Sequence, residues 1–240
     1  MRAPQIPTVL ALLLVPLFGA AILSAKMDPA LKPVTPFDDP AYHSLPEQAG
    51  LPRVLLIGDS ISIGYTLPAR ERLKGFANVH RPAQNCGPTQ MGLAQVDGWL
   101  GSTHWDVIHF NFGLHDLKYI DANGDTSTPD KGRQLSPLPV YEKNLRALVA
   151  RLKRTGAKLI FATTTPVPAG VGFRVEGDER HYNDVALRVM KENGVAIDDL
   201  WSFVRPQQAK LQNPHDVHFS PAGSTALGGA VAESIKSALR

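Results

Sequence analysis

The chain is poor in several features that would assign it to a class at once. It has one cysteine, Cys86, so it can form neither an internal disulfide nor a cysteine-based zinc cluster. It also lacks a strong excess of charge, because 25 basic residues face 22 acidic ones and leave a formal net charge of +3. No dense run of lysine and arginine and no basic stretch interleaved with aromatic residues occurs, which argues against a nucleic-acid partner. Internal repeats are missing too. The remaining composition, 43% hydrophobic and 20% charged over 240 residues, is typical of one globular domain, or two at most.

Long apolar segments are confined to the N-terminus. Arg2 precedes an apolar run over residues 9–23 that is broken only by one proline and one glycine, and small residues follow at Ser24 and Ala25. A positive end, a short apolar core and a small-residue exit are features of a secretory signal peptide. We therefore predict a signal peptide over residues 1–25 and a periplasmic or extracellular location. An uncleaved N-terminal anchor is the alternative, although a spanning helix needs about 20 apolar residues. No second run of membrane length follows, so no membrane span is expected after cleavage.

Beyond this leader the chain changes character twice. Residues 26–52 are rich in proline and show little periodicity, which predicts an extended linker. From residue 53 to 240, short apolar runs alternate with amphipathic patterns. The strand candidates are residues 54–57, 78–80, 107–112, 158–162 and 195–197, and the helix candidates are residues 140–154, 184–193 and 221–239. Nearly continuous apolar runs fit strands that are covered on both faces, and their alternation with helices predicts an α/β domain with a parallel sheet.

Polar residues follow the predicted strands, at the edge of a parallel sheet where ligands bind. Gly58-Asp59-Ser60-Ile61 comes after residues 54–57, and a helix that starts near Ile61 would place its first amides beside the Ser60 hydroxyl. Gly113-Leu114-His115-Asp116 comes after residues 107–112. Each block is weak when it is taken alone, because serines and aspartates at such places are more often helix caps or turn residues.

A third polar block lies near the C-terminus. Asp216-Val217-His218 directly precedes the last predicted helix. An aspartate close to a histidine can orient the imidazole, and the imidazole can then deprotonate a serine. A lone histidine of this kind is more often structural than catalytic, so the block gains meaning only together with the others.

Together these blocks resemble the SGNH/GDSL hydrolase family. Residues 58–61 resemble its nucleophile block, Gly87 is the natural match to the glycine of its second block, residues 113–116 resemble its third block, and His218 resembles its C-terminal base. The blocks follow one another in the family's order from about residue 54 to the end of the chain, which makes the set specific. The resemblance implies a flavodoxin-like three-layer α/β/α sandwich with a five-stranded parallel sheet.

The resemblance also implies a mechanism. Ser60 would attack an ester carbonyl, and His218 would take the serine proton and return it to the leaving alcohol. The backbone amides of Ser60 and Gly87 would hold the oxyanion. The family requires neither a metal nor an organic cofactor.

Two positions depart from the family pattern. The third oxyanion donor is usually an asparagine, but this chain has His115 there, with Asn111 as a less favourable substitute. A neutral imidazole can donate one hydrogen bond and a protonated one donates more strongly, so activity would depend on tautomer and pH. The family pattern Asp-x-x-His would place the acid at position 215, which is His215. Either a shortened loop lets Asp216 orient His218, which we favour, or a backbone carbonyl does so and a Ser-His pair operates.

The sequence thus predicts an exported serine esterase for O-acyl esters, foremost O-acetyl esters, on a small-molecule or glycan substrate. A lipase- or thioesterase-like acyl hydrolase is one alternative, and a non-catalytic carbohydrate-binding domain on the same fold is another. Residues 118–138 are expected to border the site. The stretch 169–182, which includes Arg174, is expected to be either a substrate contact or a surface loop.

Overall fold

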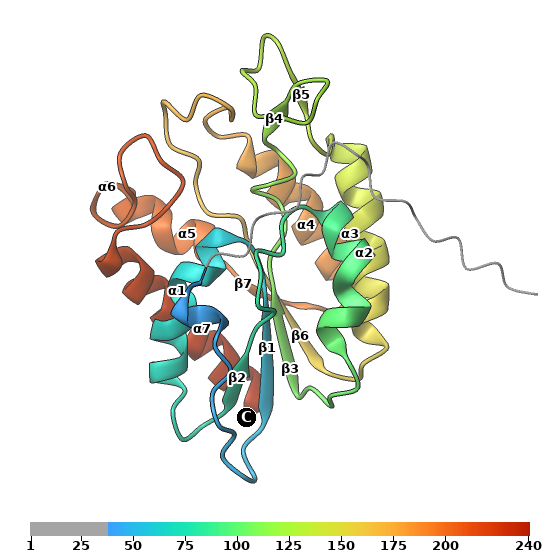
Figure 1. Ribbon diagram of the computed structural model, residues 1–240, viewed down its shortest axis with the longest axis vertical. Helices are drawn as coiled ribbons and strands as arrows, with labels where there is room; N and C mark the ends of the chain where they lie inside the picture. The colour runs from blue at the N-terminus through green and yellow to red at the C-terminus, as the bar shows by residue number, and fades with distance from the viewer. Residues whose placement is uncertain (1–37) are drawn as a thin grey trace, which may run out of the picture.

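The computed structural model describes residues 38–240, so the predicted signal peptide and residues 26–37 of the predicted linker lie outside the described residues. A five-stranded sheet forms the centre of the molecule (Figure 1). Its order is β2 (Asn78–His80), β1 (Arg53–Ile57), β3 (Val107–Phe110), β6 (Lys158–Ala162) and β7 (Ala196–Asp198), and every pair of neighbours is parallel.

Helices cover both faces of this sheet. On one face lie α1 (Ser60–Arg72) and α7 (Pro221–Leu239), and on the other lie α2 (Thr89–Leu100), α3 (Leu138–Lys153) and α4 (Glu179–Asn193) (Figure 1). The short helices α5 (Leu200–Val204) and α6 (Gln208–Leu211) and the 3-10 turns Pro40–Tyr42 and Arg205–Gln207 lie in the connections. The predicted three-layer α/β/α sandwich with a five-stranded parallel sheet is confirmed.

The strands form where the apolar runs predict them, because both faces of the sheet are buried. Residues 54–57 of β1 are at most 2% exposed. Each such aliphatic side chain contributes about 1.5–3 kcal/mol when it is fully buried. Helix α3 presents one apolar stripe to the sheet, with Tyr141, Leu145, Leu148, Val149 and Leu152 all buried. This spacing is that of an amphipathic helix with one face on the core.

Some boundaries differ from the predicted ones. Strand β3 ends at Phe110, and the side chain of the next residue, Asn111, donates from Nδ2 to the carbonyl of Ala162, 2.7 Å away. Helix α4 begins at Glu179 rather than at residue 184. Residues 118–138 contain a small antiparallel pair, β4 (Tyr119–Ile120) and β5 (Arg133–Gln134), which stands above the sheet (Figure 1).

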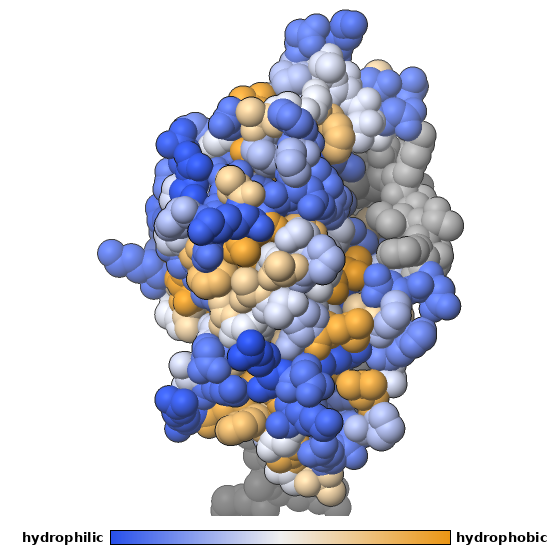
Figure 2. Space-filling model, turned by 90° about the vertical axis from the view of Figure 1, so that its left-hand side faces the viewer, coloured by the Kyte–Doolittle hydropathy of each residue, from blue (hydrophilic) through white to orange (hydrophobic). Residues whose placement is uncertain are grey.

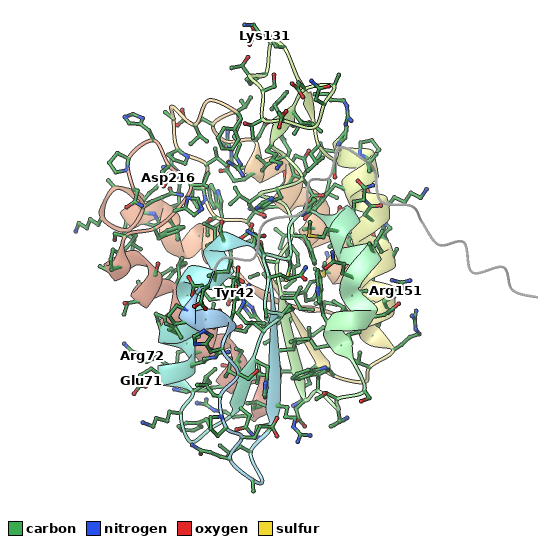
Figure 3. All side chains as sticks on the ribbon, viewed as in Figure 1. Tyr42, Glu71, Arg72, Lys131, Arg151 and Asp216 are labelled. Atoms are coloured by element: carbon green, nitrogen blue, oxygen red, sulfur yellow. The ribbon has the colours of Figure 1, made fainter. Side chains whose placement is uncertain are left out.

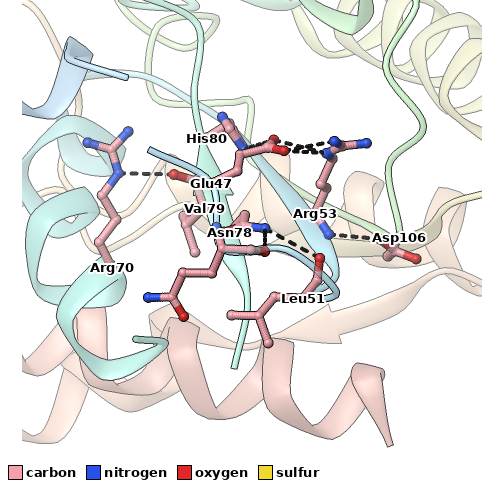
Figure 4. Close-up of polar contacts among 9 residues, drawn as sticks. Glu47, Leu51, Arg53, Arg70, Asn78, Val79, His80 and Asp106 are labelled. Carbon is pink, nitrogen blue, oxygen red and sulfur yellow. Dashed lines mark hydrogen bonds and ion pairs between the residues drawn. The ribbon is translucent and has the colours of Figure 1, made fainter. Parts of the chain in front are cut away.

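The described part of the predicted linker, residues 38–52, follows the domain surface. The Glu47 carboxylate pairs with Arg53 at 2.7 Å and with His80 at 3.0 Å (Figure 4). Gln48 and Asn78 exchange two hydrogen bonds, one of 2.8 Å from the Gln48 amide and one of 3.0 Å from the Asn78 side chain. These contacts attach the segment to the amino ends of β1 and β2, opposite the edge where the polar blocks lie.

Helices α1 and α7 approach each other closely through glycine. A Cβ at Gly228 of α7 would lie 2.5 Å from the Cβ of Pro68 and 2.8 Å from the amide nitrogen of Ala69 in α1. At Gly64 a Cβ would lie 3.2 Å from the Ser224 hydroxyl of α7. Any side chain at Gly228 would therefore push the two helices apart.

Within residues 38–240, no helix has both the length and the apolar character that crossing a membrane requires.

Candidate active site

The nucleophile candidate lies where β1 passes into α1. Asp59 is the N-cap of this helix, and its buried carboxylate accepts a hydrogen bond of 2.9 Å from the amide of Ile61. Burial raises the pKa of Asp59 above its ordinary value. Ser60 is the first helical residue, so its own amide has no acceptor within the helix. The sequence therefore folds locally into a cap that presents both the hydroxyl and the amide of Ser60 at the carboxyl edge of the sheet.

Three of the predicted residues form one hydrogen-bonded chain. The Ser60 Oγ lies 2.9 Å from the Nε2 of His218, and the Nδ1 of His218 lies 2.7 Å from the Oδ1 of Asp216. Figure 3 shows Asp216 among the loops at the carboxyl edge, far from Glu71 and Arg72 at the other end of α1. The side chains of His218 and Asp216 are 49% and 44% exposed, so the chain opens to solvent.

The charge state of Asp216 fixes the tautomer of His218. Partial burial raises the pKa of Asp216, but hydrogen bonds from the amide and the ring of His218 outweigh this and lower it below its ordinary value. An ionised carboxylate only accepts hydrogen bonds, so Nδ1 carries the ring proton of neutral His218. Nε2 is then the acceptor for the Ser60 hydroxyl. This is the arrangement of a serine with its general base.

The loop explains how an aspartate two residues before the histidine reaches the ring. An isolated bridge between Gln212 and Phe219 closes the base of the loop. Within it the amide of Asn213 donates to the carbonyl of His218 at 2.9 Å, and His215 has a positive φ of 56°. The tight turn brings the Oδ1 of Asp216 to 3.2 Å from the amide of His218 as well as to the ring.

His215, at the position where the family has its acid, is used elsewhere. Its Nδ1 lies 3.0 Å from the carbonyl oxygen of Ala169, and a Cβ at Gly170 would lie 2.5 Å from this Nδ1. The ring of His215 therefore joins two loops and makes no hydrogen bond to His218.

The turn that carries Gly87 is tied to the nucleophile block. The amide of Cys86 donates to the carbonyl of Gly58 at 3.2 Å. Gly87 itself has a φ of +58°, a conformation that favours glycine. Its amide donates to the Oδ1 of Asn85 at 2.9 Å, so an oxyanion would have to share this donor with Asn85.

His115 lies in the turn after β3, within electrostatic reach of His218 and Arg174. Burial first, and then the positive charges of Lys118, Arg174 and protonated His218, lower the pKa of His115 well below its ordinary value. The imidazole is therefore neutral at physiological pH and offers one N–H donor. The sequence left both the neutral and the protonated imidazole as possible donors, and the structure favours the neutral form.

Asn111 and Asp116, which lie near His115 in the sequence, form structural hydrogen bonds. The Asn111 side chain joins β3 to β6, as described above. Asp116 is fully buried, and both of its carboxylate oxygens lie 3.1 Å from the amide of Thr89 at the start of α2. Burial raises the pKa of Asp116 to about 7. Asp116 thus fixes the turn of residues 113–116 to α2.

Arg174 is the residue for which the sequence left two roles open, a substrate contact or part of a surface loop. It is only 8% exposed, its Nε donates to the carbonyl of Leu114 at 3.0 Å, and its guanidinium lies 4.6 Å from the ring centre of Phe173. The expectation of a surface loop is therefore wrong at this residue. A signal was present, since Arg174 stands among the apolar residues Val171, Phe173 and Val175.

Over the described range, no group of three or more histidine, cysteine, aspartate or glutamate side chains is arranged to hold a metal ion. The chemistry that the described residues support is nucleophilic. A serine, an imidazole and a carboxylate are in hydrogen-bonding contact beside the start of a helix.

Comparison with known families gives one match. Residues 56–226 match the GDSL-like lipase/acylhydrolase family, a span that contains every predicted site residue. No curated protein sequence matches the chain closely enough to count as a relative.

Solved structures with the same fold include esterases. An acetyl xylan esterase, AlAXEase, superposes with a TM-score of 0.62 at 16% identity, covering 76% of this chain and 99% of that chain. A lipase/acylhydrolase from Enterococcus faecalis has a TM-score of 0.64 at 19% identity over 78% of this chain and 96% of its own. Axe2, an acetylxylan esterase from Geobacillus stearothermophilus, has a TM-score of 0.62 at 19% identity over 77% and 94%. At these identities the likeness shows the fold.

Proposed function

Because the chain belongs to the GDSL-like lipase/acylhydrolase family and is a carboxylic ester hydrolase, we propose that it removes O-acyl groups, foremost O-acetyl groups, from carbohydrates. Ser60 is the nucleophile and His218 the general base in this proposal. The observation that carries it is the continuous contact from Ser60 through His218 to Asp216, with distances of 2.9 and 2.7 Å. A non-catalytic domain has no need of this alignment.

The mechanism follows from the protonation states. Nε2 of His218 accepts the Ser60 proton as Oγ forms a bond to the ester carbonyl carbon, and the carbonyl oxygen becomes an oxyanion. The Asp216 carboxylate stabilises the imidazolium. When the bond to the leaving alcohol breaks, Nε2 returns the proton to the alcohol oxygen. Nε2 then takes a proton from a water molecule as the water oxygen bonds to the acyl carbon of the acyl-serine. The bond to Ser60 Oγ breaks, Nε2 returns the proton to Oγ, and the carboxylic acid leaves.

The oxyanion needs donors that are in place before the reaction. The Ser60 amide is one, as the first amide of α1. The Gly87 amide is a second, shared with Asn85. We assign the third to the N–H of neutral His115, in the position where the family has asparagine.

His115→Ala is expected to lower kcat by about 10²–10³-fold, the usual loss for one oxyanion donor. His115→Asn restores a donor, so it is expected to recover most of this loss. Because the pKa of His115 is held well below its ordinary value, the pH–rate profile of His115→Asn between neutral and mildly alkaline pH should follow that of the parent. Steady-state kinetics on a 4-nitrophenyl ester measure kcat for both variants and the pH–rate profile of His115→Asn. Near-parent kcat in a folded His115→Ala protein would remove His115 from the mechanism.

A polar substrate is supported by the surroundings of the site. The segment that joins β4 to β5, residues 121–132, carries mostly charged, polar and glycine residues. It therefore cannot serve as an apolar lid that covers a lipid chain. Figure 2 shows mostly hydrophilic side chains at the upper end of the molecule, where this segment stands. Two structures of the same fold are acetyl xylan esterases, which agrees with an acetylated glycan, while the Enterococcus faecalis protein keeps the lipase-like alternative in view.

A series of acyl chain lengths tests this proposal. We expect kcat/KM to be highest for acetyl esters and to fall at least about tenfold from 4-nitrophenyl acetate to the octanoate. A site that buried the chain would instead gain about 0.8 kcal/mol for each CH₂ group. Acetate release from acetylated xylo-oligosaccharides should accompany the acetyl preference. If kcat/KM rose steadily with chain length, the lipase-like alternative would replace the proposal.

Export also belongs to the proposal. Arg2, the apolar run of residues 9–23 and the small residues up to Ala25 support a cleaved signal peptide and a periplasmic or extracellular enzyme. The N-terminal sequence of protein recovered outside the cytoplasm should begin near residue 26, and an intact Met1 on a cytoplasmic product would contradict it.

A further inference from the structure

Arg174 is a buried cation whose charged end is incompletely paired. It is 8% exposed, and its single hydrogen bond within the described part of the chain goes from Nε to the carbonyl of Leu114. Neither terminal nitrogen of the guanidinium has an acceptor among residues 38–240, and no carboxylate there forms an ion pair with it. Buried charges are normally paired and hydrogen-bonded, because removing them from water is unfavourable. The two free terminal nitrogens are therefore the unusual feature of this residue.

Arg174 lies next to the turn that carries His115 and within electrostatic reach of the candidate site. Its hydrogen bond attaches it to Leu114, the neighbour of His115 in the turn after β3. It also interacts electrostatically with Asp59 and Asp216 without forming an ion pair with either. Both carboxylates already have hydrogen-bond donors of their own, Ile61 for Asp59 and His218 for Asp216. Neither carboxylate forms a hydrogen bond or an ion pair with Arg174 within residues 38–240, so the terminal nitrogens of the guanidinium keep free donors.

A second cation without a direct partner lies within electrostatic reach of Arg174. Lys118 follows the turn of residues 113–116, is partly buried, and interacts electrostatically with Arg174 and more weakly with Asp116. Its ammonium group has no hydrogen bond or ion pair with any described residue. Two positive groups that repel each other, and that no carboxylate contacts directly, destabilise the folded protein, so a role in binding an anion is expected for the pair.

We infer that the substrate bears a carboxylate next to the scissile ester, and that Arg174 and Lys118 bind it. This inference rests on the proposed function and names the substrate class more closely, as an O-acylated glycan that contains uronic acid. The planar guanidinium with two free terminal nitrogens matches a carboxylate, which accepts two parallel hydrogen bonds. Lys118 adds a second positive charge from the segment that leads to β4.

A competing explanation gives Arg174 a purely structural role, in which its bond to Leu114 shapes the turn that carries His115. Loss of Arg174 would then slow hydrolysis of every ester alike. The two explanations differ in substrate selectivity, which a structural role does not change.

The test uses one acetylated uronic-acid oligosaccharide in two forms, with its carboxylates free or converted to primary amides. The parent enzyme is expected to show at least about tenfold higher kcat/KM on the free acid, since charge-assisted hydrogen bonds contribute about 1.5–3 kcal/mol and 1.4 kcal/mol is a factor of ten. Arg174→Gln and Lys118→Gln should each bring the acid-to-amide ratio towards one. Arg174→Lys should keep part of it. The preference of the parent should also shrink as ionic strength rises.

Arg180→Gln is the matched control, because Arg180 is an exposed arginine of the nearby α4 and should leave the ratio unchanged. Equal rates of the parent on acid and amide would overturn the inference, and so would a higher rate on a sulfated analogue than on the acid. Inactivity towards both forms and towards 4-nitrophenyl acetate would instead overturn the proposed function. Thermal unfolding shows whether Arg174→Gln folds, and Lys118→Gln tests the pair independently if it does not.

Discussion

Ser60→Ala should lower kcat for ester hydrolysis by about 10⁶-fold, the loss seen when the serine of a comparable triad is removed. The change deletes the oxygen that bonds to the acyl carbon, and neither His218 nor water held in its place reproduces a positioned alkoxide. Because the only hydrogen bond of the Ser60 hydroxyl within residues 38–240 joins it to His218, the fold should be preserved. Steady-state kinetics on 4-nitrophenyl acetate and the thermal unfolding midpoint measure the two effects. A serine-reactive phosphonate should label the parent protein and leave the variant unlabelled.

Ser62→Ala is the matched control from the same helical turn. The Ser62 hydroxyl is buried, accepts a hydrogen bond of 3.0 Å from the Nη1 of Arg81, and forms no hydrogen bond with His218. Its loss should leave the chemistry within about tenfold of the parent and reduce the free energy of unfolding by about 1.5–3 kcal/mol, the contribution of a hydrogen bond to a charged group. If Ser62→Ala were inactive and Ser60→Ala active, the assignment of the nucleophile would be wrong.

Asp216→Asn should lower kcat by about 10⁴-fold, as the corresponding change does in serine proteases. Asparagine has nearly the same shape, so the loop of residues 213–218 should persist. The variant loses the charge that stabilises the His218 imidazolium, and its amide can favour the tautomer in which Nε2 carries the proton. The pH–rate profile and the crystal structure of the variant separate this effect from misfolding.

The control for this variant is His215→Asn. His215 holds the position that the family gives to its acid, yet its ring contacts Ala169 and its φ is 56°. Asparagine tolerates a positive φ better than most residues, so the loop should survive and activity should stay within about tenfold of the parent. A loss smaller than about tenfold in Asp216→Asn would favour the Ser-His pair, with a backbone carbonyl orienting His218.

The parts of this molecule that the sequence predicts are those set by burial. Strands β1 and β6 lie where the apolar runs place them, because a strand covered on both faces has no polar positions. Ser60 and His218 could be placed at one edge because polar residues followed the strands in a known order. The contact between them also depends on the loop before α7, which the bridge between Gln212 and Phe219 closes.

Other features depend on tertiary contacts that no local pattern carries. Helix α2 contains Gly92 and Gly98, which weaken its helical pattern; a Cβ at Gly92 would lie 2.8 Å from the ring of Phe112, so packing selects the glycine. The burial of Arg174 depends on how its loop settles against Leu114. The left-handed backbone of His215, which brings Asp216 to the ring, is equally invisible in the sequence.

The close packing of α1 on α7 has a consequence for how activity arises during folding. Ser60 opens the first of these helices and His218 stands just before the second, so the two reacting atoms come from positions 158 residues apart in the chain. Contacts of such long sequence separation close a large loop and form slowly. A chain that has assembled its sheet but not yet docked its last helix holds the nucleophile without its base. The rate at which ester hydrolysis recovers after dilution from denaturant should therefore report the final docking of α7 and not the collapse of the core.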